Sequence, residues 1–423
     1  MTRWADDPRL DGLEVYRVGG AVRDERLGLK PVEHDFVVVG ATPEQMQRRG
    51  FRAVGRDFPV FLHPDSHAEY ALARTERKSA PGYRGFVFQT GPEVTLPDDL
   101  ARRDLTINAI AESREGQLID PFGGRVDLGA RVLRHVSDAF VEDPVRLLRL
   151  ARFATRFSDF SIAPETLALC RRLVTSGEVD HLVPERVWQE MSRALMHDRP
   201  SRFIEVLRET GALARLMPEL EALWGVEQKP EYHPEIDAGV HVMMVLDQAA
   251  VMQAPLDVRF ACLVHDLGKA LTPAEQLPSH HGHERSGLKP VAEVCARLRV
   301  PNDVRDLALL VCEFHLTCHR AEALRPGTVL KLLRRLDALR RPERFEHFLM
   351  ACEADKRGRK GGARRPYPQA SLLRRALEAA QSTPVEPLKA AGHRGAALGE
   401  ALDRARLDAI REVYASASRA SEA

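Results

Sequence analysis

The chain has 423 residues, a formal net charge of +1, 44% hydrophobic residues and six cysteines. Its length predicts two to four domains. The cysteines form no C-x-x-C pair, which argues against a disulfide framework or zinc finger and favours reduced, buried thiols. No apolar run approaches the roughly 20 residues of a membrane span. The N-terminal MTRWADDPRL lacks the apolar segment of a secretory signal, so we expect a cytoplasmic protein without a membrane partner.

The first third of the chain carries short β-branched and apolar runs that glycine and proline interrupt, which is typical of strands. Strands are predicted at residues 15–18, 36–39, 60–62, 68–73 and 87–90. A helix is predicted over residues 43–50, because Thr42 supplies an N-cap. This part is therefore expected to combine strands and helices.

From about residue 140 the apolar residues follow helical spacing, and we expect only helices from there to the end. The first of these helices are predicted around residues 147–154, 166–174, 187–196 and 203–207. A proline-containing segment at residues 229–237 suggests a domain boundary, and the basic, glycine-rich residues 357–368 are predicted to form a loop.

Residues 18–40, VGGAVRDERLGLKPVEHDFVVVG, combine a glycine turn, an arginine and two acids. Glu33 and Asp35 are two apart, so on a strand their carboxylates would project from one face. Such a pair repels unless a cation lies between the two groups, and Mg²⁺ prefers these hard oxygen ligands. The turn at Gly19 and Gly20 allows backbone N–H groups to approach a triphosphate, which Arg23 would also reach. The stretch therefore predicts metal-dependent nucleotidyl transfer.

Two later motifs fit the same chemistry. Residues 102–109, RRDLTINA, offer Arg103 as a phosphate ligand, while Asp104 is either a further carboxylate or a partner that orients Arg103. Residues 142–153, EDPVRLLRLARF, place Asp143 and Arg146 three apart on a predicted helix, where they would share a face. An acceptor beside a donor can pair with the edge of cytosine or adenine, whereas uracil and guanine present the opposite order.

Together these motifs resemble the class II superfamily of poly(A) polymerases and tRNA nucleotidyltransferases, and within it the bacterial CCA-adding enzymes with an HD domain. Residues 55–64 (GRDFPVFLHP), 70–79 (YALARTERKS) and 184–191 (PERVWQEM) also match, so the likeness covers nearly the whole chain. The resemblance implies an α+β nucleotidyltransferase head, with a mixed sheet and helices on one face, followed by all-α regions. The implied domains are the head at 13–140, a helical neck that binds RNA and the nucleotide base at 141–230, an HD phosphohydrolase domain at 231–356, and a basic loop with a helical tail at 357–423.

The implied reaction is template-independent addition and repair of the 3′-terminal CCA of tRNA from CTP and ATP, with Mg²⁺ and release of pyrophosphate. The implied catalytic metal ligands are Glu33 and Asp35. The implied nucleotide-binding residues are Gly20, Arg23, Arg103, Asp143, Arg146, Arg149 and Arg152. The family usually has aspartate where this chain has Glu33, and the longer side chain puts the metal geometry in doubt more than the activity.

The helical half contains a second group of polar residues, in the segments LVHDLGK, SHHGHE, EFH and EADKRGR. Imidazoles with carboxylates suit transition metals such as Ni²⁺, Zn²⁺, Mn²⁺ or Co²⁺. The adjacent His265 and Asp266 resemble the doublet of HD-type metal phosphohydrolases, which implies 2′,3′-cyclic phosphodiesterase, 2′-nucleotidase and phosphatase activities, with Ni²⁺ as the first candidate. The predicted ligands are His241, His265 and Asp266, completed from His283, His315 and Asp355.

Two other hypotheses remain at this stage. A bacterial poly(A) polymerase would share the head motifs, but those enzymes usually lack the His265-Asp266 doublet and carry a more basic tail. An RNA-binding or phosphohydrolase protein with an inactive head is supported only by Glu33. The sequence does not distinguish a monomer from a homodimer.

Overall fold

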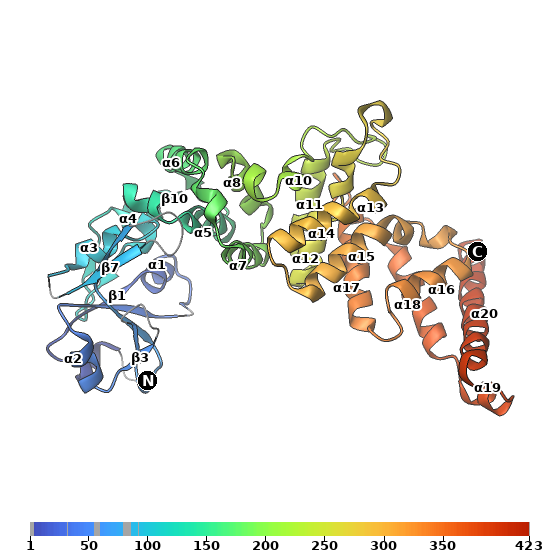
Figure 1. The fold of residues 1–423 in the computed structure, drawn as a ribbon, viewed down its shortest axis with the longest axis horizontal. Coiled ribbons are helices and arrows are strands. Elements are labelled where there is room, and N and C mark those ends of the chain that lie inside the picture. The colour runs from blue at the N-terminus through green and yellow to red at the C-terminus, as the bar shows by residue number, and fades with distance from the viewer. Residues whose placement is uncertain (1–3, 32, 55–59, 79–85, 92, 423) are drawn as a thin grey trace. The chain divides into compact units, whose positions relative to one another are not determined.

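The structure is a computed structural model that describes residues 4–31, 33–54, 60–78, 86–91 and 93–422 (Figure 1). The chain forms two compact units, unit 1 with residues 1–194 and 202–216, and unit 2 with residues 195–201 and 217–423. Unit 1 contains the main sheet and unit 2 is helical, which confirms the predicted change from mixed to helical structure. The bounds of the four predicted domains stay a prediction.

A seven-stranded sheet lies at the centre of the head, in the order β3-β4-β5-β2-β1-β8-β9. Its strands are β3 (Arg52–Val54), β4 (Val60–Leu62), β5 (Glu69–Leu72), β2 (Asp35–Val39), β1 (Glu14–Val18), β8 (Ala111–Glu112) and β9 (Leu118–Ile119). Strand β2 pairs antiparallel with β1 and parallel with β5, so the predicted mixed sheet is confirmed.

Short strands also occur outside this sheet. Strands β6 (Arg74–Lys78) and β7 (Phe86–Thr90) form an antiparallel pair. Strand β10 (Val132–Leu133) pairs in parallel with β11 (Ser161–Ile162), which lies in the region where only helices were expected. Residues 55–59 of the GRDFPVFLHP motif and residue 79 of YALARTERKS lie outside the described residues.

Helices pack on both faces of the sheet, where the sequence suggested one. Phe36 and Val38 of β2 pack with Met46 of α2 (Pro43–Arg48), and the predicted Thr42 cap begins that helix. Val37 points to the opposite face, because successive strand residues alternate, and packs with Leu100 of α3 (Leu96–Ala101).

The remaining helices of unit 1 follow the sheet in sequence, except for α1. They are α1 (Gly20–Arg26), α4 (Gly124–Ala130), α5 (Val145–Arg156), α6 (Pro164–Thr175), α7 (Pro184–Leu195), α8 (Ser201–Thr210) and α9 (Ala212–Leu216), with α7 and α8 each contributing a residue to unit 2. Helix α5 buries an apolar face that includes Leu147, Leu150 and Ala151, as the helical spacing predicts.

Unit 2 is built around four helices that pack against one another, α11 (Ala238–Val251), α12 (Leu256–Val264), α15 (Asn302–His319) and α17 (Pro342–Arg357) (Figure 1). Other helices surround or follow them, namely α10 (Pro218–Glu221), α13 (His283–Ser286), α14 (Leu288–Arg297), α16 (Pro326–Arg335), α18 (Pro368–Gln381), α19 (Glu386–Ala390) and α20 (Gly395–Glu422). All six cysteines are free and buried, as expected.

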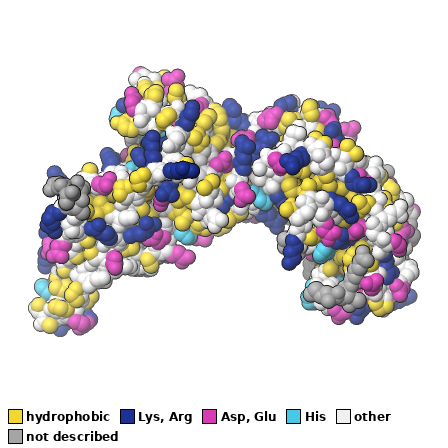
Figure 2. Space-filling model, turned by 180° about the vertical axis from the view of Figure 1, so that it is seen from behind, with side chains coloured by type: hydrophobic (Ala, Val, Ile, Leu, Met, Phe, Trp, Pro, Cys, Tyr) yellow, Lys and Arg dark blue, Asp and Glu magenta, His cyan; other side chains and the backbone are white. Residues whose placement is uncertain are grey.

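Two surface properties bear on partners. Within the described ranges, none of the helices combines the length and apolar character that crossing a bilayer requires. On the face drawn in Figure 2, lysine and arginine side chains are distributed over both units and interspersed with acidic ones, which agrees with the net charge of +1.

The end of α17 lies directly against α11, and these two helices carry Asp355 and His241. A Cβ on Gly358 would lie 2.5 Å from the Cα of Val245 in α11. We predict that Gly358→Ala lowers the free energy of unfolding by about 1–3 kcal/mol, because backbone has to move to admit the methyl group. Calorimetric melting measures this loss. Gly327→Ala is the control, since a Cβ there meets nothing within 4 Å; equal melting temperatures for both variants would refute the close approach.

Candidate nucleotide and metal sites

The predicted glycine turn lies at the end of β1. Gly19 adopts a φ of +70°, which favours glycine, and it caps α1. A Cβ at Gly19 would lie only 3.0 Å from Nη1 of Arg103, so the guanidinium rests against the turn. The structure therefore brings Gly19, Gly20 and Arg103 together, as the phosphate-binding interpretation requires.

Asp35 lies beside this turn because Val18 pairs with Asp35 in the β1–β2 register. Protein atoms around the carboxyl raise the pKa of Asp35; Arg103 opposes this shift, and the Glu33 carboxylate adds to it. The prediction that both acids lie on one strand is wrong, since β2 begins at Asp35 and Glu33 belongs to the preceding connection. Both residues are exposed and offer hard oxygen ligands.

Glu69 is an acid that the sequence analysis missed. It is the parallel-strand partner of Asp35, and the alternation in β5 directs Tyr70 and Leu72 to the opposite face. Glu69 is therefore on the face of Asp35, one strand away, and is exposed. Only the strand register shows this, because the two residues are far apart in sequence.

Arg23 is directed into the protein. It is 3% exposed, its Nε donates to Asp24 Oδ1 at 2.9 Å, and its Nη1 donates to Asn108 Oδ1. Asp24 also accepts from Arg156 Nη2 at 2.7 Å. Arg23 thus connects α1 to Asn108 and, through Asp24, to α5.

Asp104 pairs with Arg149 rather than with Arg103. Its Oδ2 accepts from Arg149 Nε at 2.7 Å, and its Oδ1 accepts from Asn108 Nδ2 at 2.9 Å. Burial alone would raise the pKa of Asp104, but these partners hold it well below its ordinary value. Arg152 similarly donates from Nε to Glu190 at 2.5 Å. These charges hold α5 in place.

Asp143 and Arg146 do not share a helix. Helix α5 begins at Val145. Asp143 has an extended backbone, because Pro144 disfavours the helical conformation of the residue before it. The Asp143 carboxylate accepts from Val145 N at 3.0 Å. Arg146 donates to the carbonyls of Ala139 and Arg102 at 2.9 and 2.7 Å. The helical geometry proposed for these two residues is therefore wrong.

The second predicted site is brought together in full within unit 2. Its six residues are His241, His265, Asp266, His283, His315 and Asp355, each at most 6% exposed. Asp266 Oδ2 lies 3.2 Å from His265 Nε2 and 3.6 Å from His241 Nε2. Asp266 Oδ1 lies 3.2 Å from His283 Nε2 and 3.6 Å from His315 Nε2. Asp355 Oδ1 lies 3.1 Å from His241 Nε2.

The four imidazoles are all oriented by their Nδ1 atoms. In His241, Nδ1 lies 2.8 Å from the carboxylate of Glu235. In His265, His283 and His315, Nδ1 lies 2.8, 2.7 and 3.0 Å from a backbone carbonyl oxygen, respectively. Each ring therefore turns its Nε2 toward the two carboxylates. Outer partners of this kind are typical of metal-bound histidines.

Among the described residues, several buried atoms of this cluster form no hydrogen bond of normal geometry, although oppositely charged groups lie close to them. They are Nε2 of His241 and His265, both carboxylate oxygens of Asp266, and Oδ1 of Asp355. Buried polar atoms without well-formed hydrogen bonds are costly, and a bound cation would offset this cost. The donor set therefore fits a transition metal. Two groups of ligand atoms are close enough to hold an ion, His241–His265–Asp355 and Asp266–His283–His315.

Sequence reasoning missed the residues that support these ligands. Glu235 holds both His241 and His233, with Oε1 at 2.8 and 3.1 Å. His319 Nε2 lies 2.5 Å from Asp355 Oδ2, and Lys269 Nζ lies 2.5 Å from Asp266 Oδ2. Lys269 was visible in HDLGK, and His319 lies four residues after His315 on the same helix face.

Comparisons with known proteins agree with this geometry. The family "Poly A polymerase head domain" matches residues 15–134, "Probable RNA and SrmB- binding site of polymerase A" matches residues 159–223, and "HD domain" matches residues 239–341. A solved structure, the Thermotoga maritima CCA-adding enzyme complexed with tRNA, is 22% identical to this chain in sequence and has a TM-score of 0.62. The match covers 96% of this chain and 91% of that enzyme, and it supports the fold.

Two relatives are similar over most of their length. The Multifunctional CCA protein of Thioalkalivibrio sulfidiphilus is 60% identical over 405 residues, which cover 95% of this chain and 99% of that protein. The protein of the same name from Laribacter hongkongensis is 63% identical over 370 residues, 88% of this chain and 91% of that protein. On this likeness, and with a nucleotidyltransferase-type head joined to an HD cluster, the chain belongs to the multifunctional CCA protein family of CCA-adding tRNA nucleotidyltransferases.

Proposed function

We propose that this protein adds and repairs the 3′-terminal CCA of tRNA, using CTP and ATP and releasing pyrophosphate. The observation that carries the proposal is the meeting of the Gly19 turn, the Arg103 guanidinium and the Asp35 carboxylate where β1 ends and β2 begins. Donors for a triphosphate thus lie next to an acid that can hold a metal. The name of the 60% identical relatives supports the same activity.

In the proposed reaction, the 3′ hydroxyl oxygen of tRNA attacks the α-phosphorus of a nucleotide, and the bond to the leaving pyrophosphate breaks. This happens twice with CTP and once with ATP. Mg²⁺, held by Glu33 and Asp35 with Glu69 beside them, would supply activation of the hydroxyl and neutralisation of the leaving group. Arg103 and the backbone at Gly20 would bind phosphate oxygens. Arg23 would act by holding the turn, since its guanidinium is buried.

Base selection would depend on Asp143 and Arg146. The Asp143 carboxylate can accept from the amine of cytosine or adenine, and a guanidinium can donate to the neighbouring ring nitrogen. Arg146 now holds two backbone carbonyls, so we propose that it releases them when a base enters. Arg149 donates through Nε to Asp104, and Arg152 donates through Nε to Glu190. We propose that the Nη groups of both arginines bind the nucleotide.

We propose a second, hydrolytic activity for unit 2. It would remove terminal phosphates as a 2′,3′-cyclic phosphodiesterase, 2′-nucleotidase and phosphatase, with Ni²⁺ as the first candidate metal. This proposal is supported by the buried oxygen and Nε2 atoms around Asp266 that form no hydrogen bond of normal geometry and could bind a metal. Bound there, the metal would polarise the phosphoryl group and provide a hydroxide at neutral pH. Lys269 and Arg359, which flank Asp266 and Asp355, would neutralise the phosphate. A cytoplasmic location and a monomer or homodimer stay predictions.

The first test is incubation of the protein with Mg²⁺ and a tRNA transcript that ends before CCA. We expect two additions with CTP alone and a third only when ATP is also present. Asp35→Asn should lower the rate by about 10²–10³, because the edge loses a charged metal ligand. Glu14→Gln is the control, as Glu14 lies on β1 at the opposite end of the β1–β2 pairing.

Other products would overturn this proposal. A long A tract would identify a poly(A) polymerase, and no incorporation would mean that Glu33 has cost the head its chemistry. An Asp35→Asn protein with the rate of the wild type would remove Asp35 from the site.

The second test separates the two activities. Asp266→Asn should abolish Ni²⁺-dependent hydrolysis of 2′,3′-cyclic AMP, because the cluster loses the carboxylate that faces all four histidines, and should leave CCA addition unchanged. Asp303→Asn, an exposed acid on the helix that carries His315, is the matched control. Hydrolysis by Asp266→Asn at the rate of the wild type would exclude the cluster as the hydrolytic site.

A further inference from the structure

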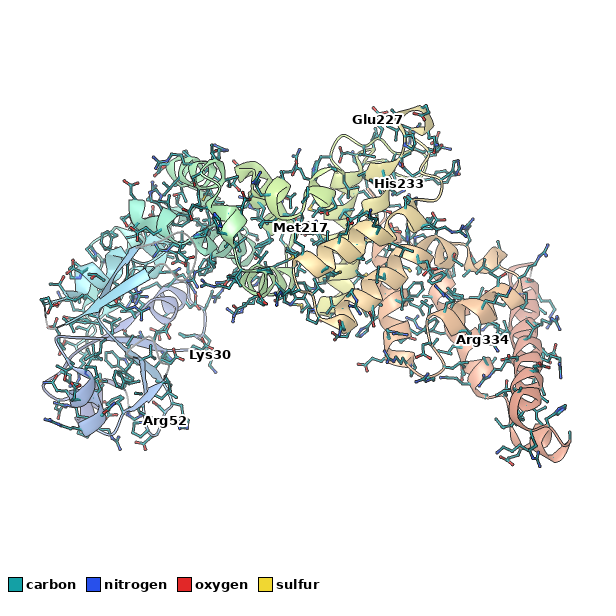
Figure 3. All side chains as sticks on the ribbon, viewed as in Figure 1. Lys30, Arg52, Met217, Glu227, His233 and Arg334 are labelled. Atoms are coloured by element: carbon teal, nitrogen blue, oxygen red, sulfur yellow. The ribbon has the colours of Figure 1, made fainter. Side chains whose placement is uncertain are left out.

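An aromatic side chain stands at the mouth of the pocket above the HD cluster. The pocket has a volume of about 500 Å³, and its lining includes Asp266, Asp355, His319 and Tyr232. Tyr232 is 63% exposed, the highest value among the exposed tyrosine, phenylalanine and tryptophan side chains of the described residues. It lies on the loop before α11 that Figure 3 marks with Glu227 and His233. A half-apolar ring held in water beside a polar pocket offers a flat surface to a ligand.

The loop that carries Tyr232 is fixed to the metal site at several points. Arg359 Nη1 donates to the Tyr232 carbonyl at 3.3 Å, and the same guanidinium pairs with Asp355 at 3.6 Å. The next residue, His233, bonds Glu235, which holds His241. The backbone of Tyr232 is therefore placed by the metal ligands, while its ring stays exposed. Because this backbone is already fixed, a ligand that binds here would cause only a small loss of conformational entropy.

The charges around the ring point to an anion. Five basic side chains line the pocket, Lys229, Lys269, Arg320, Lys356 and Arg359. Three acids line it, of which Asp266 and Asp355 belong to the metal cluster and leave only Glu284. A ligand that fits has a phosphate for the metal end and a flat ring for the mouth, and this combination is the chemistry of a nucleotide.

We propose that Tyr232 is a specificity-determining residue, a platform on which the base of the substrate's terminal nucleoside stacks while its phosphate lies over the HD cluster. This inference rests on the proposed hydrolytic function and assigns to Tyr232 the preference of that site for substrates that carry a base over base-free phosphate monoesters. Stacking of a base on an aromatic side chain tolerates any base, so purine and pyrimidine nucleotides would both be accepted.

The test compares two substrates with the Ni²⁺-loaded full chain, adenosine 2′-phosphate and the base-free glycerol 2-phosphate. Tyr232→Ala should raise the KM for the nucleotide about 5- to 150-fold, which corresponds to roughly 1–3 kcal/mol of stacking, and leave kcat unchanged. The KM for glycerol 2-phosphate should stay the same. Tyr232→Phe keeps the ring and should behave like the wild type. Leu271→Ala is the control, since Leu271 is 57% exposed and is not part of this pocket's lining.

Equal effects of Tyr232→Ala on both substrates, or no effect on the nucleotide, would overturn the platform. Calorimetric binding of adenosine 2′-phosphate provides a readout that needs no turnover. If the wild type hydrolyses neither substrate, the proposed hydrolytic function fails. In that case, weaker binding by Tyr232→Ala alone still supports the platform, and equal binding by all variants rejects it.

Discussion

Unit 2 depends on one buried carboxylate that faces four imidazoles. Asp266 is 1% exposed, and each of its oxygens lies within 3.6 Å of two histidine Nε2 atoms. Burying an ion costs several kcal/mol unless partners compensate it. Lys269 and the histidines hold the pKa of Asp266 well below its ordinary value against the effect of burial. A cation would also contact the buried nitrogen and oxygen atoms of the cluster that form no hydrogen bond of normal geometry. The four packed helices, the turn after α12 and α13 bring these groups together.

The head uses buried charge differently. Three buried carboxylates of unit 1, Asp24, Asp104 and Glu190, are each paired with an arginine of α5. These pairs connect α5 to the glycine turn through Arg23 and Asn108, so a change in α5 would alter the position of the turn. The acids proposed to hold Mg²⁺ are instead exposed, at the start of β2 and in the connection before it. The partner of a carboxylate thus separates a positioning role from a ligand role in both units.

Local pattern was enough to predict much of this. The β-branched runs predicted β1, β2, β4, β5 and β7, and the polar residues of the helical half included all six residues that the fold brings together in the HD cluster. Those residues carry their chemistry in their side-chain type. Asp143 was misplaced because Pro144 outweighs the helical spacing that follows it. Glu33 was misplaced because spacing two apart does not fix where a strand begins.

Other features depend on contacts between distant segments. Glu69 becomes a neighbour of Asp35 only through the parallel register of β2 and β5. Glu235 and Arg359 support the HD ligands from a loop and from the residues after α17. The pairing of Asp104 with Arg149 also joins segments 45 residues apart. A single sequence carries no signal for such pairs, because tertiary packing decides them.

We expect the HD cluster to be a metal centre whose occupancy stabilises the fold of unit 2. Calorimetric melting of the chelator-treated full chain, with and without Ni²⁺, measures this stabilisation. A ligand at 100 times its Kd adds about 2.7 kcal/mol to the folded state. We therefore expect Ni²⁺ to raise the melting temperature by several degrees, at roughly 2–4 °C per kcal/mol of added stability. An equal concentration of Mg²⁺ should not raise it. Identical melting with and without Ni²⁺ would contradict it.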